Sequence, residues 1–287
     1  MVAEGASGIS MPRKSIVWLA SYPKSGNTWM RVFLANYLFD RPSPMPINEI
    51  HKIGMGDAIT KTYAMAAGQQ IDPADDRRTL NLRRKVLGGI VANDADINFV
   101  KTHNIRDKAL GADLIPESVT KSAIYVIRNP LDVAVSFGRH YSQTPETTVA
   151  AFANPQHVVL GAGPNVTQFL GTWSAHVMSW TRHRDFPVLT LRYEDLSTNP
   201  EECFGRLIEH LGMAVDPKRL EKAIRFSSFD ELKGQEQKAG FIEQSANGSR
   251  FFHTGTTEQW RTALTSGQIA KLRDDHGPVM REFGYDP

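Results

Sequence analysis

An apolar run that breaks into a short polar turn and continues as an amphipathic segment lies near the start of the chain. Residues 16–20 form the run, the turn reads SYPKSGNTW, and residues 28–39 have the pattern of a helix. Strand, phosphate-sized loop and helix in this order are typical of proteins that bind nucleotides. Gly26 permits a positive φ, so consecutive backbone N–H groups can converge on one anion at the positive end of the helix dipole.

Strand and helix patterns alternate along the rest of the chain. Further apolar runs occupy residues 97–101, 123–127 and 188–192, and helix patterns occupy residues 131–141, 165–184, 200–211 and 266–283. The runs are apolar at nearly every position, as in parallel strands covered on both faces. We therefore predict an α/β fold, a three-layer single domain with a central mostly parallel sheet, P-loop NTPase-like and flanked by helices. We assign this domain to residues 13–287 and expect a disordered tail at residues 1–12.

Composition excludes several classes of function. The net charge of +2, without a long Lys/Arg stripe, argues against a nucleic-acid partner. No stretch approaches the ~20 apolar residues of a membrane-spanning helix. The one cysteine, Cys203, excludes an internal disulfide and suits a reducing compartment. We expect a cytoplasmic protein.

Three long segments do not fit the alternating pattern: residues 41–96, 142–164 and 233–258. In an open α/β sheet, ligands bind beyond the carboxyl ends of the strands, where long connections emerge. These segments are therefore candidate walls or lids around a second substrate. Helical decoration without ligand contact is the alternative, and the charges of residues 72–85 suggest a solvated helix face.

The turn differs from the usual phosphate-binding loop of nucleotide kinases and ATPases. In that loop the lysine follows the last glycine, and the next Ser/Thr ligates magnesium. Here Lys24 precedes Gly26, and Ser25, Asn27 and Thr28 supply neutral donors. No convincing apolar run ends in an aspartate that could hold the metal. The order predicts a loop for a 5′-phosphate that needs no metal.

A second motif, RNPLDVAVS, joins the run at residues 123–127 to the next helix. Asn129 and Pro130 suit the N-cap and first helical position. Arg128 and Ser136 could hold one further phosphate, the first through its planar guanidinium and the second through its hydroxyl. The alternative is an ordinary strand-to-helix junction in which Arg128 pairs with an acid such as Asp132.

A third motif, FVKTHN, follows the run at residues 97–101. Lys101 and His103 are two positions apart, which places them on the same side of an extended segment. A histidine beside a cation at the carboxyl end of a strand could act as a general base next to a group that stabilises a leaving group. A lone histidine is more often structural, so the motif alone does not decide.

Together these motifs resemble the cytosolic-type sulfotransferases, which transfer a sulfuryl group from 3′-phosphoadenosine 5′-phosphosulfate (PAPS) to a hydroxyl or amine. The family's YPKSG-T/N-T-W loop, its Lys-Thr-His segment and its Arg-to-Ser 3′-phosphate motif occur here in family order. Similar stretches are GTWSAHVMSW, RYEDL and SSFDELK. The likeness extends from about residue 16 to the C-terminus, and it implies a PAPS-dependent enzyme that releases 3′-phosphoadenosine 5′-phosphate (PAP) and requires no metal.

The resemblance implies a role for each motif residue. His103 would take the proton of the acceptor, and Lys24 and Lys101 would stabilise the charge on the bridging and sulfuryl oxygens. The residues implied in donor binding are Lys24, Ser25, Gly26, Asn27, Thr28, Trp29, Arg128, Ser136, Tyr193, Phe229, Arg250 and Gly255. Of these, Trp29, Tyr193 and Phe229 match positions near the adenine, and each could equally be a core aromatic.

One departure from the family lies near the C-terminus. The family has Arg-Lys-Gly where this chain has His253, Thr254 and Gly255, so two cations that would bind the 3′-phosphate are missing. Arg250 could take their place, the loop backbone and His253 could suffice, or the affinity for the nucleotide could be weaker. The Gly, Ser and Asn content of this loop predicts mobility without nucleotide. The family's dimerisation motif is also missing, so no oligomeric state is predicted.

Two other classes of function remain as alternatives. A P-loop kinase for a nucleotide or small molecule would need a magnesium site and prefer ATP, and a catalytically inactive PAPS- or PAP-binding protein would not need a base. For the enzyme, the neutral character of residues 142–164 favours an uncharged hydroxylated small molecule, as in natural-product modification. An anionic acceptor would require a basic surface, for which the candidates are Arg77, Arg78, Arg83 and Arg84.

Overall fold

The structure, a computed structural model, describes residues 14–183, 185–244 and 250–285. The tail that we predict at residues 1–12 lies outside the described residues. Within them, the main sheet has five strands in the order β2-β3-β1-β6-β9. Every neighbouring pair in this sheet is parallel. The predicted parallel α/β sheet is therefore confirmed.

The strands of the main sheet are β1 (Ile16–Ser21), β2 (Met55–Gly56), β3 (Asn98–Thr102), β6 (Thr120–Ile127) and β9 (Val188–Arg192). Two small antiparallel pairs join β4 (Lys108–Ala109) to β5 (Ala112–Asp113) and β7 (Val158–Val159) to β8 (Gln168–Phe169). The small pairs lie outside the main sheet.

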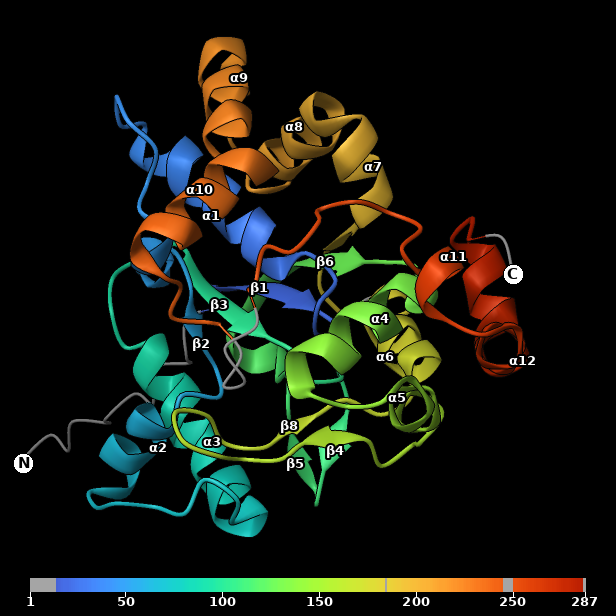
Figure 1. Ribbon diagram of the computed structural model, residues 1–287. Helices are drawn as coiled ribbons and strands as arrows, with labels where there is room; N and C mark the ends of the chain where they lie inside the picture. The colour runs from blue at the N-terminus through green and yellow to red at the C-terminus, as the bar shows by residue number, and fades with distance from the viewer. Residues whose placement is uncertain (1–13, 184, 245–249, 286–287) are drawn as a thin grey trace, which may run out of the picture.

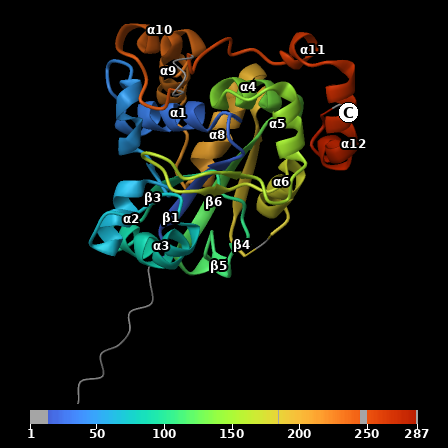
Figure 2. The same cartoon turned by 60° about the horizontal axis from the view of Figure 1, so that its bottom comes forward.

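Helices cover both faces of the sheet (Figures 1 and 2). They are α1 (Asn27–Phe39), α2 (Thr60–Ala67), α3 (Asp76–Ile90), α4 (Pro130–Tyr141), α5 (Pro145–Phe152), α6 (Trp173–Thr181), α7 (Tyr193–Thr198), α8 (Pro200–His210), α9 (Pro217–Phe226), α10 (Phe229–Ala239), α11 (Trp260–Ala263) and α12 (Ser266–Glu282). Two 3₁₀ turns, η1 (Ile47–Lys52) and η2 (Glu117–Val119), complete the described elements.

Alternate side chains of β1 enter two different cores. Ile16 and Trp18 pack with residues of α4, α5, α6 and α12, whereas Val17 and Leu19 pack with residues of α1, α8 and α9. All six residues of β1 are buried. A strand that is covered on both faces is apolar along nearly its whole length, which is why the sequence from Ile16 to Ala20 does not alternate.

The junctions after β1 and β6 form because their residues suit helix starts. Gly26, the N-cap of α1, has φ 105° and ψ 9°, a conformation that glycine adopts at little cost. Asn129 caps α4 by accepting a hydrogen bond from the N–H of Leu131, and Pro130 follows in the first turn. Helix α4 therefore begins almost directly after β6, and α1 begins after the short loop that follows β1.

The prediction of a helix at residues 165–184 is wrong in its first half. Gln168–Phe169 is strand β8, and Gly171 has φ 64°. The helix begins only after Thr172, whose side chain accepts a hydrogen bond from the N–H of Ala175. The apolar residues before this cap contribute to a loop and a short strand, because capping decides where the helix starts.

The three long segments contain more regular structure than their composition indicates. Residues 41–96 include η1, β2, α2 and α3, residues 142–164 include α5 and β7, and α10 extends into residues 233–258. Residues 245–249, within the loop for which we predict mobility, lie outside the described residues. In the described ranges, no helix combines the length and apolar character needed to cross a membrane.

Candidate active site

The three sequence motifs meet at the carboxyl edge of the sheet. The loop follows β1 at Ser21, the Lys-Thr-His segment ends β3, and Arg128 follows β6. Because β3 and β6 are the two neighbours of β1, parallel pairing brings their carboxyl ends together around the loop. Residues 250–259, which lead into α11, pass over this edge towards α4 (Figure 1), and contact Arg128 and Asp132 on the way.

The loop forms a cradle of donors at the start of α1. The hydroxyl of Ser25 is buried and, among the described residues, has no hydrogen-bond partner. A Cβ on Gly26 would lie 2.7 Å from the Tyr193 ring, so the backbone approaches this ring as only glycine can. Asn27 uses its amide to donate to the Leu19 carbonyl (2.8 Å), which ties the loop to β1. An unpaired buried donor beside a helix N-terminus suits an anionic ligand.

Lys24 adds a positive charge to the cradle. Its backbone has φ 69°, and its Nζ lies 3.6 Å from the ring centre of Phe251 and 3.4 Å from Nδ1 of His140. Burial, and then the ammonium of Lys101, lower the pKa of Lys24 to about 7. An anion bound in the cradle would oppose both effects, raise the pKa of Lys24 and favour its charged form.

Glu243 occupies the side of the cradle that faces β3. Its carboxylate lies 2.7 Å from Nη1 of Arg31 and 3.2 Å from Nζ of Lys101, and it accepts a hydrogen bond from Thr28 Oγ1 (3.1 Å). Despite burial, the two cations hold the pKa of this carboxyl far below its usual range. Burial lowers the pKa of Lys101, and Glu243 opposes that shift.

Sequence reasoning missed both Arg31 and Glu243. Arg31 is 2 % exposed and lies on α1, three residues beyond Thr28, on the side of the helix that faces the site. That spacing is a signal that could have identified it. Glu243 lies in a segment of mixed charge more than 200 residues away, and no local pattern distinguishes it from its neighbours.

His103 lies at the end of β3 with a defined tautomer. Its Nδ1 is 2.8 Å from the carbonyl oxygen of Ser21. Because a carbonyl only accepts, Nδ1 carries the hydrogen and Nε2 keeps a lone pair. Burial, and then the charge of Lys101, lower the pKa of His103 to about 3, so the ring is neutral near pH 7.

Arg128 connects the loop to the segment before α11. It donates to the carbonyl oxygens of Lys24 and Thr256, both at 3.3 Å, and its guanidinium lies 4.2 Å from the ring centre of Tyr193. Its Nε is buried and, within the described residues, has no partner. The nearest oxygen of Asp132 is 4.0 Å away, at the limit of an ion pair.

Asp132 has other partners. Its carboxylate accepts hydrogen bonds from the backbone N–H groups of Glu258 (2.7 Å) and Trp260 (3.2 Å). Asp132 therefore holds the segment before α11 and also pairs with Arg128 at 4.0 Å, so the pairing that we considered as the alternative for Arg128 is present. Ser136 is half-buried two turns into α4.

Of the three aromatic residues expected near the adenine, Trp29 and Tyr193 lie at the loop, whereas Phe229 packs against Phe252. Trp29 packs edge-on against Tyr193, with ring centres 5.7 Å apart, and also against Phe204. Phe229 begins α10, and a Cβ on Gly255 would lie 2.3 Å from its ring. Trp29 and Tyr193 thus contact the core and the loop at once, so the two roles considered for them are compatible.

His253, at the position where the resemblance implies an arginine, has several cations near it. Its pKa is lowered by partial burial and then by Arg139, Lys233 and Arg250. Arg250 and His253 are both exposed. Arg139 is also repelled by Arg128, which lowers its pKa further after burial. Positive charge therefore gathers near the segment that the missing Arg-Lys pair would occupy.

The basic residues of α3 do not all lie on one surface, which corrects our expectation that the four arginines form a single basic cluster. The other charged residues of 72–85 are exposed or half-buried, as the predicted solvated helix face requires. Arg83 is 3 % exposed and forms an ion pair with Asp57 at 2.7 Å. Arg77 and Arg78 line a hollow of about 390 Å³ between α2 and α3. Arg84 is exposed. The helical period separates them, because Arg83 lies on the buried face of α3.

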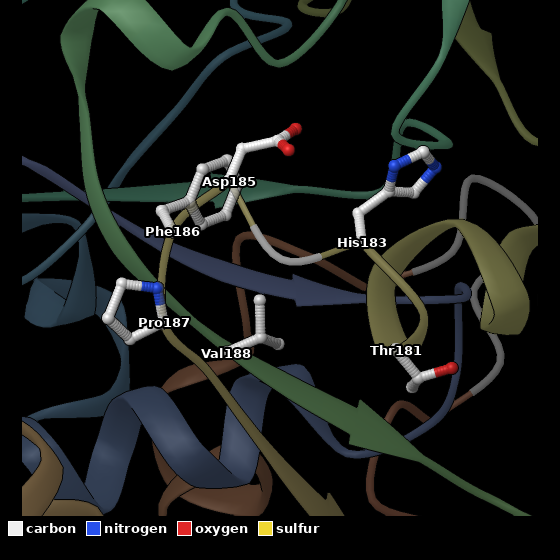
Figure 3. A pocket seen from close by; sticks show the side chains of 6 residues that line it. All are labelled: Thr181, His183, Asp185, Phe186, Pro187 and Val188. Carbon is white, nitrogen blue, oxygen red and sulfur yellow. The ribbon is translucent and has the colours of Figure 1, made fainter.

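A second hollow, of about 290 Å³, lies at the amino end of β9. Its walls are Thr181, His183, Asp185, Phe186, Pro187 and Val188 (Figure 3). Asp185 and Phe186 also contact Arg106, through an ion pair of 2.6 Å and a ring contact of 4.0 Å. The hollow is at the edge of the sheet opposite to the loop, so it is separate from the site described above.

Comparison with known proteins decides the family. A family model described as the sulfotransferase domain matches residues 14–284. The chain belongs to the sulfotransferase family. It is 24 % identical to sulfotransferase 1 family member D1 of Mus musculus, over 94 % of this chain and 85 % of the relative. It is 25 % identical to sulfotransferase 1B1 of Canis lupus familiaris, over 91 % and 81 % respectively. The predicted class of enzyme, a sulfotransferase, is confirmed.

Solved structures show the same fold. The crystal structure of mouse sulfotransferase SULT7A1 complexed with PAP has a TM-score of 0.60 and 21 % identity, and the match covers 94 % of this chain and 84 % of that chain. Retinol dehydratase in complex with androsterone and PAP has a TM-score of 0.64 and 18 % identity, with 95 % and 82 % covered. The predicted three-layer fold of this sulfotransferase is thereby confirmed.

Proposed function

We propose that this PAPS-dependent sulfotransferase moves the sulfuryl group of its donor to a hydroxyl, or an amine, of a small-molecule acceptor, with His103 as general base. One observation supports this most strongly. The Nδ1–H of His103 is held by Ser21, the last residue of β1, directly before the loop that carries Lys24 and Gly26. A neutral base with its second nitrogen available thus lies beside an anion cradle.

The donor set of the cradle fits the phosphosulfate group of PAPS. The buried hydroxyl of Ser25, the hydroxyl of Thr28 and the N–H groups at the start of α1 are neutral donors, and Lys24 is the adjacent cation. On the far side, Arg128 and Ser136 would take the 3′-phosphate, Arg128 through its unpaired Nε. We assign the adenine to the neighbourhood of Trp29, Tyr193 and Phe229, because Trp29 and Tyr193 pack together at the loop and the backbone of Gly255 closely approaches the Phe229 ring.

The transfer follows from these positions. The O–H bond of the acceptor breaks as its proton moves to Nε2 of His103, and a new S–O bond forms. The bond between sulfur and the bridging oxygen breaks, and its electron pair leaves on PAP, where Lys24 neutralises the charge. Lys101 stabilises the sulfuryl oxygens. The negative charge of bound donor raises the pKa of His103 from its low value in the free protein, which strengthens the base.

We propose that the acceptor is an uncharged hydroxylated molecule. The α3 arginines that could have bound an anionic acceptor are divided between a buried ion pair and the protein surface. The neutral character of residues 142–164 also favours such an acceptor. The single cysteine is compatible with a cytoplasmic location, which we also propose.

Replacement of His103 by alanine tests the base. We expect PAP binding to be nearly unchanged and turnover of radiolabelled PAPS with a panel of phenols and alicyclic alcohols to fall by about 10²–10⁴-fold. His183→Ala is the matched control, because this exposed histidine lies at the opposite edge of the sheet. Retained turnover in His103→Ala would refute the assignment.

Calorimetric titration separates the alternative functions. Binding of PAP without metal, with little response to ATP and magnesium, supports the sulfotransferase. Preference for magnesium-ATP would support the kinase, and tight PAP binding without turnover of any acceptor would support an inactive PAP-binding protein.

A further inference from the structure

A buried polar network lies directly behind His103. Lys101 and His103 face the cradle, where they contact Glu243 and Ser21. Thr102 lies between them in the chain, and its side chain points the opposite way, as alternation along a strand requires. Its hydroxyl donates to Oδ2 of Asp57 at 2.8 Å, and both residues are at most 2 % exposed.

The hydroxyl of Thr102 fixes the chain on both sides of His103. While it donates to Asp57, it also accepts a hydrogen bond from the backbone N–H of Asn104 at 3.1 Å. The side chain of the residue before His103 is thus bonded to the backbone of the residue after it. The carbonyl of His103 accepts a hydrogen bond from Nε2 of His176 (3.1 Å). A side-chain bond from residue i to the N–H of residue i+2 restricts the backbone of the residue between them.

Asp57 is the anchor of the network. Its Oδ2 also receives Nδ2 of Asn104 (3.0 Å) and Nη2 of Arg83 (2.7 Å), and its own N–H donates to the carbonyl of Lys101 (3.0 Å). Asp57 therefore contacts residues 101, 102 and 104 but leaves His103 free to face the site.

Arg83 is itself held at both ends of its guanidinium. Its Nε donates to the Leu114 carbonyl (2.8 Å) and its Nη1 to the hydroxyl of Tyr63 (3.1 Å). A buried ion pair with its hydrogen bonds satisfied is seldom better for stability than well-packed apolar residues of the same volume. The convergence of three donors on one oxygen beside His103 thus indicates a role in placing that residue.

We propose that Asp57 and Thr102 are positioning residues for His103. Together they set the backbone so that Nδ1 of His103 meets the Ser21 carbonyl and Nε2 faces the acceptor. The inference rests on the proposed function of His103 as base. A displacement of about 1 Å in a reacting group reduces rate by up to about 100-fold, which is the effect expected when the network is broken.

Two substitutions of Thr102 distinguish positioning from packing. Thr102→Val keeps the shape of the side chain and removes the hydroxyl, whereas Thr102→Ser keeps the hydroxyl and removes a methyl group. If Thr102 only fills space, serine is the more damaging change. If its hydroxyl positions His103, valine is the more damaging change. Both variants lose some stability, so thermal stability is not the readout.

The first readout is the tautomer of His103, measured by magnetic resonance of nitrogen-labelled histidine and assigned with the His103→Ala spectrum. We expect the Nδ1–H form in the wild type and Thr102→Ser, and a mixture of tautomers in Thr102→Val. Turnover of PAPS with an acceptor of the wild-type enzyme is the second readout, and we expect kcat in Thr102→Val to fall by up to about 100-fold while PAP affinity is retained.

Wild-type tautomer and kcat in Thr102→Val would overturn the proposal, as would equal losses in both variants. Asp57→Asn, which keeps the shape and removes the charge, should resemble Thr102→Val in the tautomer of His103. Failure of the proposed function has a different signature, because retained turnover in His103→Ala refutes the base while the tautomer measurement still reports on the network.

Discussion

Replacing Gly26 by alanine tests the geometry on which the donor site depends. Gly26 has φ 105°, and an added Cβ would lie 2.7 Å from Cδ2 and 3.3 Å from Cε2 of Tyr193, and 3.6 Å from Cγ1 of Val126. Tyr193 cannot move away easily, because it is buried and the guanidinium of Arg128 lies 4.2 Å from its ring centre. The overlap between the new Cβ and the Tyr193 ring can therefore be removed only by a change in the conformation of the loop.

Two costs add in this variant. A residue with a Cβ held at such a φ costs about 1–2 kcal/mol, and the overlap with a buried ring costs about 1–3 kcal/mol. The native conformation of the loop is therefore disfavoured by about 2–5 kcal/mol. Since about 1.4 kcal/mol corresponds to a tenfold change in an equilibrium constant, even the lower value predicts PAP binding about 30-fold weaker.

The cost can appear as a loss of PAP affinity, which calorimetry measures, or as a loss of stability, which urea unfolding measures. If the loop changes conformation, affinity falls and stability is retained; if it stays, the free energy of unfolding falls. Gly234→Ala is the matched control, because it lies within α10 and an added Cβ meets nothing within 4 Å. It should gain about 0.5–1 kcal/mol of stability and bind PAP normally. Wild-type affinity together with wild-type stability in Gly26→Ala would refute the reasoning.

Three further predictions concern charge. Glu243→Gln should bind PAP about tenfold more tightly, because the ligand no longer has to displace a carboxylate from Thr28 and Lys101; unchanged or weaker binding in calorimetry would contradict this. Since the pKa of Lys24 is about 7 and an anion requires its charged form, PAP affinity should fall by up to about tenfold per unit as pH rises above that value. Lys24→Arg should abolish that slope, and a flat wild-type profile would exclude the mechanism. Burial lowers the pKa of His176 from 6.5 to about 4, so the unfolded chain takes up the proton first, and the contribution of this one histidine to the free energy of unfolding should fall by up to about 1.4 kcal/mol per unit between these values as pH decreases. Urea unfolding should show a smaller slope for His176→Gln, and an equal slope would contradict the prediction.

The elements with local signals could be predicted from the sequence. The strand at residues 16–20, the turn and helix α1 were predictable, because a continuous apolar run, a glycine and an amphipathic segment are signals within a few residues. The start of α4 was predictable for the same reason, since Asn129 and Pro130 form a local cap. The start of α6 was not, because the apolar residues before Thr172 continue the helical pattern past the cap.

Features that depend on distant residues could not be predicted. Arg83 has the same sequence environment as its arginine neighbours, and its burial depends on Asp57, 26 positions earlier in the chain. The ion pair between Glu243 and Arg31 joins residues that are 212 positions apart. Glu243 also contacts Lys101, and the segment that contains Glu243 has no distinguishing sequence pattern. Only the folded arrangement brings these groups together.

For the site itself, the sequence determined which chemical groups are available: a lysine-containing loop, a Lys-Thr-His segment and an Arg-to-Ser motif, each at the end of a strand. Parallel pairing of β1 with β3 and β6 then decided that these groups meet at one edge. The tertiary structure alone decided the tautomer of His103 and the low pKa values of Lys24 and His103. The physical reason is that hydrogen bonds and desolvation depend on atoms brought near by folding, whereas residue type and spacing are already present in the unfolded chain.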